Sequence, residues 1–494
     1  MADEIELKLS LPLSQHPLLE RHPLLQRAGP PIRKQVDNVY YDTSGHALWH
    51  RGITLRLRRQ GDEWLQTVKC AGTSQGGLSV RPEWEIPHGG QFDFDAVTDR
   101  RVRRFLKKHQ AALIPVFETR FKRCTWRLPA NGEGALLLML DAGWITAAGR
   151  RAPIAELELE LAGADAGILF ATARALAQDM QLIPENRSKA ERGYRLFKHE
   201  GEAPVTAGAV PLTPDMSPAQ AFHRLALAAL DHFNANRDGL LTQDDPEYPH
   251  QMRVALRRLR ATLQLFSPLL APSWHTTQPL LQQLTTTLGA VRDLDVLHSD
   301  ILTPVREGQR RNPDLAVLDA RIAQLRAKAR SHARAMIAAQ EYGRFLLEIL
   351  SLAHDESTRE TADRSLAEFL HQRVQRLARG TATQARVAAS LSAQDLHVLR
   401  IRMKRLRYGL ESAAPLLHVP RRNIRRLAQL QFRLGQLNDI AIAGRILLPL
   451  TRDDPRLARA VMLVADGHRP RVNSLLRQIA ADLPWLHRFP HLFP

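Results

Sequence analysis

The stretch EIELKL at residues 4–9 alternates charged and apolar residues without interruption. Successive side chains of a β-strand point to opposite faces, so Glu4, Glu6 and Lys8 share one face while the apolar residues share the other. An edge strand with a solvated outer face would account for this pattern. The alternative is a strand whose charged face points inward, and it requires the same alternation on other strands.

Further strands repeat the alternation within the first 200 residues. ITLRLRR (53–59) sets Arg56 and Arg58 on one face, and ELELE (156–160) sets three glutamates on one face. Short alternating strands at this density predict an antiparallel sheet closed into a β-barrel, with a few flanking helices. If the apolar faces pack outward against those helices, the lumen becomes a charged tunnel. Carboxylates would come from the first and late strands, and Arg and Lys from the middle ones.

The composition indicates a polyanionic partner. The 494 residues carry a formal net charge of +18, an excess typical of proteins that bind nucleic acid, an anionic membrane or a phosphate polymer. The two cysteines, Cys70 and Cys124, form no CxxC pair, which argues against a disulfide framework or a zinc site. No signal peptide is visible, and the apolar run at 135–140 is too short to span a membrane. We therefore expect a cytoplasmic protein without a membrane partner.

A change of periodicity divides the chain. Residues 199–218 are rich in Gly and Pro and are typical of a linker. Long helical patterns begin at Ser217-Pro218, an N-cap followed by Pro at the first helical position. Residues 211–494 hold 40 Lys and Arg against 26 Asp and Glu, so this half carries +14 of the net charge. The prediction is a multidomain α+β chain with a barrel domain at 1–200, a linker at 201–217 and an all-α domain at 218–494.

The first half resembles the CYTH superfamily, the triphosphate tunnel metalloenzymes. EIELK at residues 4–8 matches the ExExK signature of that family, which would be weak support alone. Seven further blocks follow in the family's order, and together they make the resemblance specific. These blocks are YYDT (40–43), LRLR (55–58), QTVK (66–69), VRPEWE (80–85), LMLDAG (138–143), ELELELAG (156–163) and SKAERGY (188–194).

The resemblance implies hydrolysis of inorganic triphosphate with Mg²⁺ or Mn²⁺. Clustered carboxylates suit such hard cations, and clustered Arg and Lys suit phosphate oxygens. The candidate metal ligands are Glu4, Glu6, Glu158 and Glu160. The candidate catalytic residues are Glu4, Glu6, Lys8 and Lys69. The candidate phosphate-binding residues are Arg56, Arg58, Arg81, Arg123 and Lys189.

Three positions in this half remain open. The family's cation in PVFETRFKRCTW (115–126) could be Arg120, Lys122 or Arg123, and Arg123 is our choice. Glu156 could bind metal or pair with an Arg or Lys. Asp141 could enter the tunnel, or it could be a turn residue before a glycine.

The second half contains an internal duplication. HQMRVALRRLR (250–260) returns as HVLRIRMKRLR (397–407), 147 residues later. Each copy predicts a helix with an apolar stripe and, half a turn away, a stripe of one His and three cations. A surface face normally mixes charge signs, whereas these stripes contain no acid. Since a face of one sign repels itself, the pattern favours anion binding.

This half resembles the CHAD domain, an all-helical domain built as two similar four-helix bundles. The expected repeats are 218–365 and 366–494. The resemblance implies binding of inorganic polyphosphate, with localisation to polyphosphate granules as one outcome. The candidate residues are His250, Arg253, Arg257, Arg260, His397, Arg400, Lys404 and Arg407.

Alternative functions are weighed against the triphosphatase prediction. One is a non-catalytic polyphosphate-binding or granule-associated protein, which the intact Glu4/Glu6/Lys8 set argues against. Another is a thiamine triphosphatase or adenylate cyclase of the same fold, for which no base-recognition pocket can be located. Nucleic acid is a disfavoured partner because the basic stripes lack interleaved aromatic residues for base stacking.

Overall fold

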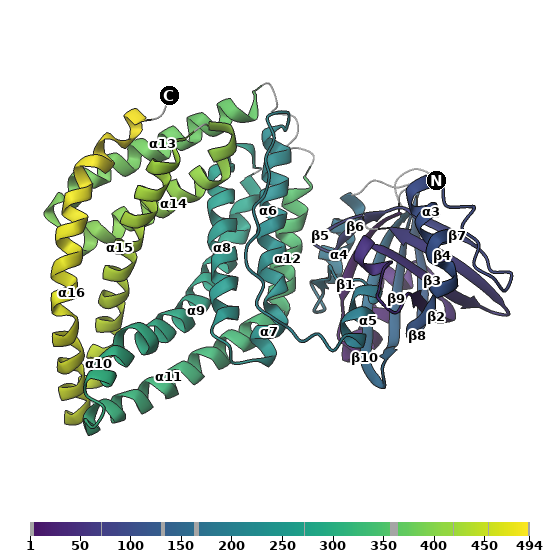
Figure 1. Ribbon diagram of the computed structural model, residues 1–494, viewed down its shortest axis with the longest axis horizontal. Helices are drawn as coiled ribbons and strands as arrows, with labels where there is room; N and C mark the ends of the chain where they lie inside the picture. The colour runs from purple at the N-terminus through teal and green to yellow at the C-terminus, as the bar shows by residue number, and fades with distance from the viewer. Residues whose placement is uncertain are drawn as a thin grey trace. The chain divides into compact units, whose positions relative to one another are not determined.

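The computed structural model describes residues 4–70, 72–129, 134–162, 167–270, 272–355, 364–417, 419–452 and 454–492. The chain divides into two compact units (Figure 1). We call them the sheet unit, residues 1–203 with 339–354, and the helical unit, residues 204–338 with 355–494. Among the described residues, no helix combines the length and the apolar character needed to cross a membrane.

The described strands of the sheet unit form one antiparallel sheet. Their order is β5-β6-β1-β10-β9-β8-β2-β3-β4-β7, with β11 paired to β1. Each sequence segment predicted to alternate lies in this sheet. The strands are β1 (Glu4–Ser10), β2 (Ile32–Asp42), β3 (Ile53–Gln60), β4 (Glu63–Cys70), β5 (Thr73–Gln75), β6 (Leu78–Arg81), β7 (Glu83–Pro87), β8 (Ile114–Pro129), β9 (Ala135–Ala147), β10 (Arg150–Ala162) and β11 (Ile183–Pro184).

Hydrogen bonds between the described strands do not close the sheet. β6 pairs with β1 whereas β7 pairs with β4, although only Pro82 separates β6 from β7 in the sequence. Proline has no N–H to donate to a ladder, so the two segments part at this residue and join opposite ends of the sheet. The predicted antiparallel sheet is confirmed. The predicted closure of this sheet into a barrel by strand pairing is not confirmed. Only the covalent chain at Pro82, and no hydrogen-bonded ladder between the described strands, joins β6 to β7.

The apolar faces of the strands pack outward against helices. Leu55 and Val68 join Leu106 of α3 in one buried cluster, and Phe117 joins Tyr194 of α5 in another. Because side chains alternate along a strand, burying these faces outward turns the charged faces inward. The helices of this unit are α1 (His16–Glu20), α2 (Pro23–Gln26), α3 (Arg100–His109), α4 (Gly167–Leu176), α5 (Lys189–Phe197) and α12 (Gln340–Ala353).

The helical unit confirms the predicted all-α half. Its first and second repeats begin alike, because Ser217 and Ser365 each cap a helix through a capping box. The helices are α6 (Pro218–Ala235), α7 (Arg237–Thr242), α8 (Glu247–Leu265), α9 (Gln278–Val296), α10 (Thr303–Gly308), α11 (Pro313–Ala338), α13 (Leu366–Val387), α14 (Ala393–Leu417), α15 (Arg421–Leu447) and α16 (Pro455–Arg488).

The two repeats do not pack in the same way. In the second repeat α13 contacts both α14 and α16. In the first repeat α6, α8, α9 and α11 contact one another in chain order, and α11 also contacts α16. The prediction of two equivalent four-helix bundles therefore stays a prediction.

Candidate active site

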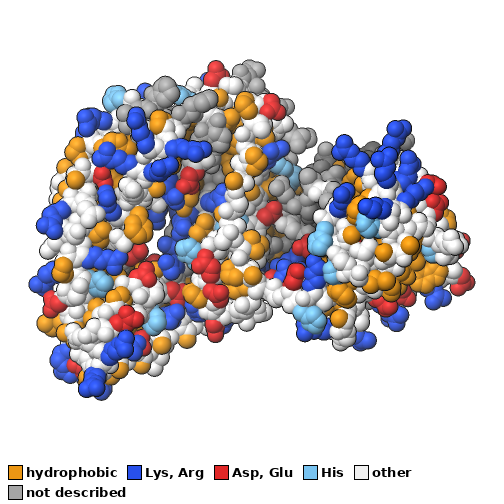
Figure 2. Space-filling view, viewed as in Figure 1, with side chains coloured by type: hydrophobic (Ala, Val, Ile, Leu, Met, Phe, Trp, Pro, Cys, Tyr) orange, Lys and Arg blue, Asp and Glu red, His pale blue; other side chains and the backbone are white. Residues whose placement is uncertain are grey.

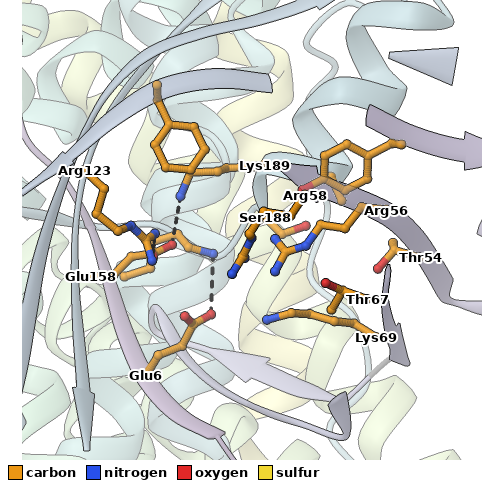
Figure 3. A pocket seen from close by; sticks show the side chains of 14 residues that line it. Glu6, Thr54, Arg56, Arg58, Thr67, Lys69, Arg123, Glu158, Ser188 and Lys189 are labelled. Carbon is orange, nitrogen blue, oxygen red and sulfur yellow. Dashed lines mark hydrogen bonds and ion pairs between the residues drawn. The ribbon is translucent and has the colours of Figure 1, made fainter. Parts of the chain in front are cut away.

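A polar cavity lies between the inward faces of the strands (Figure 3). The side chains of Glu6 and Lys8 are each only 5% exposed, which excludes a solvated edge strand as the explanation of β1. Strands β1, β2, β3, β4, β8 and β10 contribute to the lining together with the start of α5. The lining residues are Glu6, Lys8, Tyr40, Thr54, Arg56, Arg58, Thr67, Lys69, Phe121, Arg123, Glu158, Ser188, Lys189 and Ala190.

Strands β3 and β4 supply a cationic wall. Arg56, Arg58 and Lys69 point toward the same space from these strands (Figure 3). Lys69 Nζ lies 2.8 Å from a carboxylate oxygen of Glu83, and Arg56 lies 3.6 Å from the other oxygen. Arg58 lies 3.7 Å from Glu85. Repulsion from Arg56, together with burial, lowers the pKa of Arg58 to about 10, so this guanidinium stays charged at neutral pH.

On the opposite side, Lys189 and Arg123 hold a buried set of carboxylates that we call the ion-pair network. Lys189 Nζ lies 2.7 Å from Asp141 and 2.9 Å from Glu158, and it also pairs with Glu156. The Arg123 guanidinium lies 2.6 Å from both Asp141 and Glu158. Burial opposes ionisation of Glu158, but Lys189 and Arg123 outweigh it and hold its pKa well below the usual range. Burial raises the pKa of Glu156 against the attraction of Lys189.

Two groups of carboxylates lie on this side of the sheet, and among the described residues one of them has the oxygen spacing of a metal site. The three carboxylates of the ion-pair network offer oxygens within 4.8 Å of one another, but Lys189 already pairs with all three. The second group follows from the β1–β10 register, which places Glu6 opposite Glu160. Like charges directly opposite on one face of a sheet repel, and a cation between them relieves that repulsion. Glu6 itself lies 3.8 Å from Lys8, so both groups contain a carboxylate that already pairs with a lysine.

The predicted site residues separate into three groups. The cavity brings together Glu6, Lys8, Arg56, Arg58, Lys69, Arg123, Glu158 and Lys189. Glu160 is outside this lining, opposite Glu6 on β10. The side chains of Glu4 and Arg81 lie outside the described part of the structure, and only their backbone pairing between β1 and β6 is described.

The structure also places the residues whose roles the sequence left open. Arg123 lines the cavity, whereas the side chain of Arg120 is 75% exposed. Lys122 is exposed as well. Asp141 is fully buried within the ion-pair network, and Glu156 pairs with Lys189 in the same network. Both acids therefore act first as partners of buried cations.

Sequence reasoning missed the neutral residues of the lining. Thr54 shares a strand face with Arg56 and Arg58, and Thr67 shares one with Lys69, so strand phase alone could have found them. Ser188 accepts a hydrogen bond as the N-cap of α5, directly before Lys189. Tyr40 lay within the YYDT block but was given no role, and no sequence signal marked Phe121, because aromatic residues are equally common in cores.

In the helical unit, the two repeated basic stripes converge. Helices α8 and α14 contact each other, and a second cavity is lined from both by Arg257, Lys404 and Arg407. Arg257 Nε donates a hydrogen bond of 3.1 Å to the hydroxyl of Tyr408 on α14. Figure 2 shows Lys and Arg side chains along the hollow of this unit. Arg260, the last residue of the α8 stripe, is exposed.

The carboxylates near these cations compensate them only in part. Burial, followed by repulsion from Arg400, Arg257 and Arg253, lowers the pKa of Lys404 to about 6. Burial and Arg257 lower the pKa of Arg253 to about 10, although Asp293 lies 4.0 Å from it. A bound anion would relieve this repulsion.

The two histidines of the stripes have different surroundings. His397 Nδ1 lies 3.2 Å from the side-chain oxygen of Asn438. His250 Nδ1 is buried without a hydrogen-bond partner among the described residues. Burial and the neighbouring Arg292 lower the pKa of His250. Arg292 in the first repeat corresponds to Asn438 in the second. The histidine of the first repeat therefore has a cation as its neighbour, whereas the histidine of the second has an amide.

Comparison with family models finds two domains in order along the chain. A CYTH domain matches residues 2–194, and a CHAD domain matches residues 224–448. Among solved structures, the CHAD domain from the plant Ricinus communis is 31% identical, with a TM-score of 0.50. That match covers 60% of this chain and 98% of the plant domain.

Two relatives extend the comparison. The chain is 29% identical over 209 residues to an inorganic triphosphatase of Haemophilus influenzae. The match covers 40% of this chain and only 55% of the length of that relative. An uncharacterized protein of Mycobacterium tuberculosis is 26% identical over 409 residues, which cover 76% of this chain and 75% of that protein.

Replacing Arg123 with Gln should destabilise the sheet unit. The change leaves Asp141 and Glu158 buried without the guanidinium, and breaking a buried ion pair from one side costs about 3–5 kcal/mol. The folded-state pKa of Glu158 lies below its ordinary value of 4.5. This stabilisation is therefore present above about pH 4.5 and is lost as the pH falls through the depressed pKa. Hydrogen exchange of the β8 amides, measured at increasing urea concentration, gives the free energy of unfolding.

Arg120→Gln is the matched control for this prediction, because it lies on the same strand with its side chain 75% exposed. Its free energy of unfolding should change by less than about 1 kcal/mol, as for exposed ion pairs. Equal unfolding free energies for the two variants would contradict the compensating role of Arg123.

Proposed function

The chain belongs to the CYTH family through residues 2–194 and to the CHAD family through residues 224–448, and on that premise we propose that it hydrolyses inorganic triphosphate. The observation that carries this proposal is the convergence of six Lys and Arg side chains on one cavity that also holds carboxylates. Such an arrangement binds a compact polyanion and stabilises charge that develops during phosphoryl transfer. The products would be diphosphate and phosphate.

The cationic wall would hold the phosphate chain. Arg56, Arg58 and Lys69 have more positive charge than Glu83 and Glu85 neutralise, so phosphate oxygens would complete their compensation. In the hydrolysis, a water oxygen attacks the terminal phosphorus and the bond from that phosphorus to the bridging oxygen breaks. The bonding electrons leave with diphosphate, and the wall stabilises the negative charge on the leaving oxygen.

The opposite wall would supply the carboxylates that hold the metal ion. Lys189 and Arg123 keep Glu158 ionised and fixed in position. Glu6, Glu158 and Glu160, with Glu4 as the sequence predicts, would hold Mg²⁺ or Mn²⁺. When bound, such a cation neutralises phosphate oxygens and orients the attacking water.

The lining favours an inorganic substrate over a nucleotide or thiamine triphosphate. Only Tyr40 and Phe121 are aromatic among the described lining residues. Tyr40 stacks on Phe117 with ring centroids 4.4 Å apart, and Lys189 lies over the Phe121 ring at 5.0 Å. Each ring is already engaged on one side within the protein, which favours a substrate that needs no base stacking.

The cavity of the helical unit would bind inorganic polyphosphate. Arg257 and Lys404 line this cavity from α8 and α14, beside Arg253 and Arg400, and Asp293 and Asp439 compensate these cations only in part, so a chain of phosphates would supply the missing anions. The shared surface of both repeats, and not two separate stripes, would then be the binding site. The same binding would hold the protein on polyphosphate granules.

Replacing Glu6 with Gln should abolish most of the hydrolysis. The amide keeps the size of the side chain but removes the charge opposite Glu160, so the turnover number for tripolyphosphate should fall by about 10²-fold or more. Phosphate release with Mg²⁺ and with Mn²⁺ measures it. Glu118→Gln, an exposed residue on β8, is the matched control and should keep wild-type turnover.

Wild-type protein that releases no phosphate from tripolyphosphate, ATP or thiamine triphosphate with either metal would overturn hydrolysis. It would leave a phosphate-binding protein as the function of the cavity. Faster turnover of ATP or thiamine triphosphate than of tripolyphosphate would overturn the proposal that the substrate is inorganic.

Polyphosphate binding to the helical unit should tighten as the pH falls from 8 toward 6. The pKa of Lys404 is lowered to about 6 in the free protein, and bound phosphates would raise it. Lys404 is therefore largely neutral above pH 6 in the free protein and must take up a proton on binding, which penalises binding more as the pH rises. Titration calorimetry in buffers of different ionisation enthalpy measures this proton uptake.

Lys404→Met should lose the proton uptake assigned to this side chain. Lys328→Met, an exposed lysine on α11, is the control and should keep it. Both measurements belong in a Glu6→Gln background, so that the polyphosphate is not consumed. Identical proton uptake in Lys404→Met and wild type would contradict the assignment.

A further inference from the structure

Helix α12 (Gln340–Ala353) lies inside the CHAD match in the sequence but belongs to the sheet unit in space. It packs there against α4 and β11. Nine of its 14 residues are buried, so it is apolar on most of its circumference. A helix of this kind is stable only when other elements cover it.

Polar contacts fix α12 along α4 and the segment after it. Gln340 Nε2 donates hydrogen bonds of 2.9 and 2.7 Å to the carbonyl oxygens of Ala177 and Gln178. Glu348 pairs with Arg174 of α4 at 2.9 Å. Because Gln340 and Glu348 are about two helical turns apart, α12 is held at two points and its register is set.

Two glycines mark where α12 approaches the chain around β1. A Cβ added to Gly343 would lie 2.0 Å from the carbonyl oxygen of Leu182, so the helix packs closely against the backbone that leads into β11. A Cβ added to Gly76, in the turn between β5 and β6, would lie 2.0 Å from Cδ2 of the buried Leu350. Helix α12 therefore rests on two separate segments.

Those two segments hold strand β1 at Lys8. The Lys8 N–H donates a 2.9 Å hydrogen bond to the carbonyl oxygen of Gly77, and the Glu185 N–H donates one of 2.9 Å to the carbonyl oxygen of Lys8. Gly77 directly follows Gly76, and Glu185 directly follows β11. Helix α12 therefore contacts the two segments whose backbones hydrogen-bond to β1, the strand that carries Glu6 and Lys8.

We propose that α12, a helix encoded within the CHAD part of the chain, is the element that positions β1 for hydrolysis in the cavity. This proposal rests on the proposed function of that cavity. It makes the helical half of the sequence necessary for the chemistry independently of polyphosphate binding. Since the cationic wall stands on β3 and β4, α12 should influence turnover at Glu6 and Lys8 more than substrate binding.

The test uses the full chain with Gly343→Ala. In most helices Gly→Ala is stabilising, but here the new methyl group would overlap the Leu182 carbonyl oxygen and push α12 away. The turnover number for tripolyphosphate should fall at least about tenfold, with KM changed less than about threefold. Polyphosphate affinity of the helical unit should stay at the wild-type value. Gly444→Ala in α15 is the matched control, because nothing lies within 4 Å of its added Cβ.

Leu350→Ala provides a second variant that removes a contact without creating an overlap. It should lower turnover in the same direction by a smaller factor. Amide hydrogen exchange gives a readout that does not need activity: the amides of Lys8 and Glu185 should exchange faster in both variants. The amide of Cys124, in the β8–β9 ladder, should keep its wild-type rate.

The outcomes separate the two proposals. Unchanged exchange at Lys8 and Glu185 with unchanged turnover would overturn the role of α12. Equal acceleration across the whole sheet, Cys124 included, would also overturn it, because α12 would then support global stability and not the position of β1. A wild-type chain without triphosphatase activity would overturn the proposed function, while the exchange measurements would still decide whether α12 holds β1.

Discussion

Each charge that faces the inside of the sheet needs compensation, because burial removes the water that stabilises it. The ion-pair network supplies this on one wall, where Arg123 and Lys189 share three carboxylates. The outer apolar faces impose the matching requirement, since they need helices such as α3 and α5 to cover them. The inward charge and the outward helices are therefore two consequences of one alternating pattern.

The sequence was informative wherever the controlling interaction was local. Alternation has a period of two residues, so EIELK alone is sufficient to group Glu6 with Lys8 on one face. The choice between Lys122 and Arg123 was not local. It depends on the β8–β9 register, which sets Arg123 opposite Asp141, 18 residues further along the chain. The alternation along β8 allows either Lys122 or Arg123 to face inward, and only the pairing with β9 shows which of them does.

Other features depend on contacts that no local pattern encodes. The amphipathic stripes of α8 and α14 were predicted singly, but their convergence on one cavity follows from tertiary packing. Pro82 lies inside the VRPEWE block, yet the departure of β6 and β7 to opposite ends of the sheet depends on their pairing with β1 and β4. Helix α12 has an ordinary helical pattern, and nothing in that pattern shows that it leaves the helical unit.

The two cavities handle buried cations in opposite ways. In the sheet unit, despite burial, Asp141, Glu156 and Glu158 raise the pKa of Lys189, so its charge is permanent. In the helical unit, burial and neighbouring arginines lower the pKa of Lys404 to about 6, because Asp439 offsets them only in part. A permanent charge suits a site that must hold carboxylates in place during a reaction. An under-compensated cluster suits a site whose charge balance is completed by its ligand, which makes ligand binding and proton binding a single equilibrium.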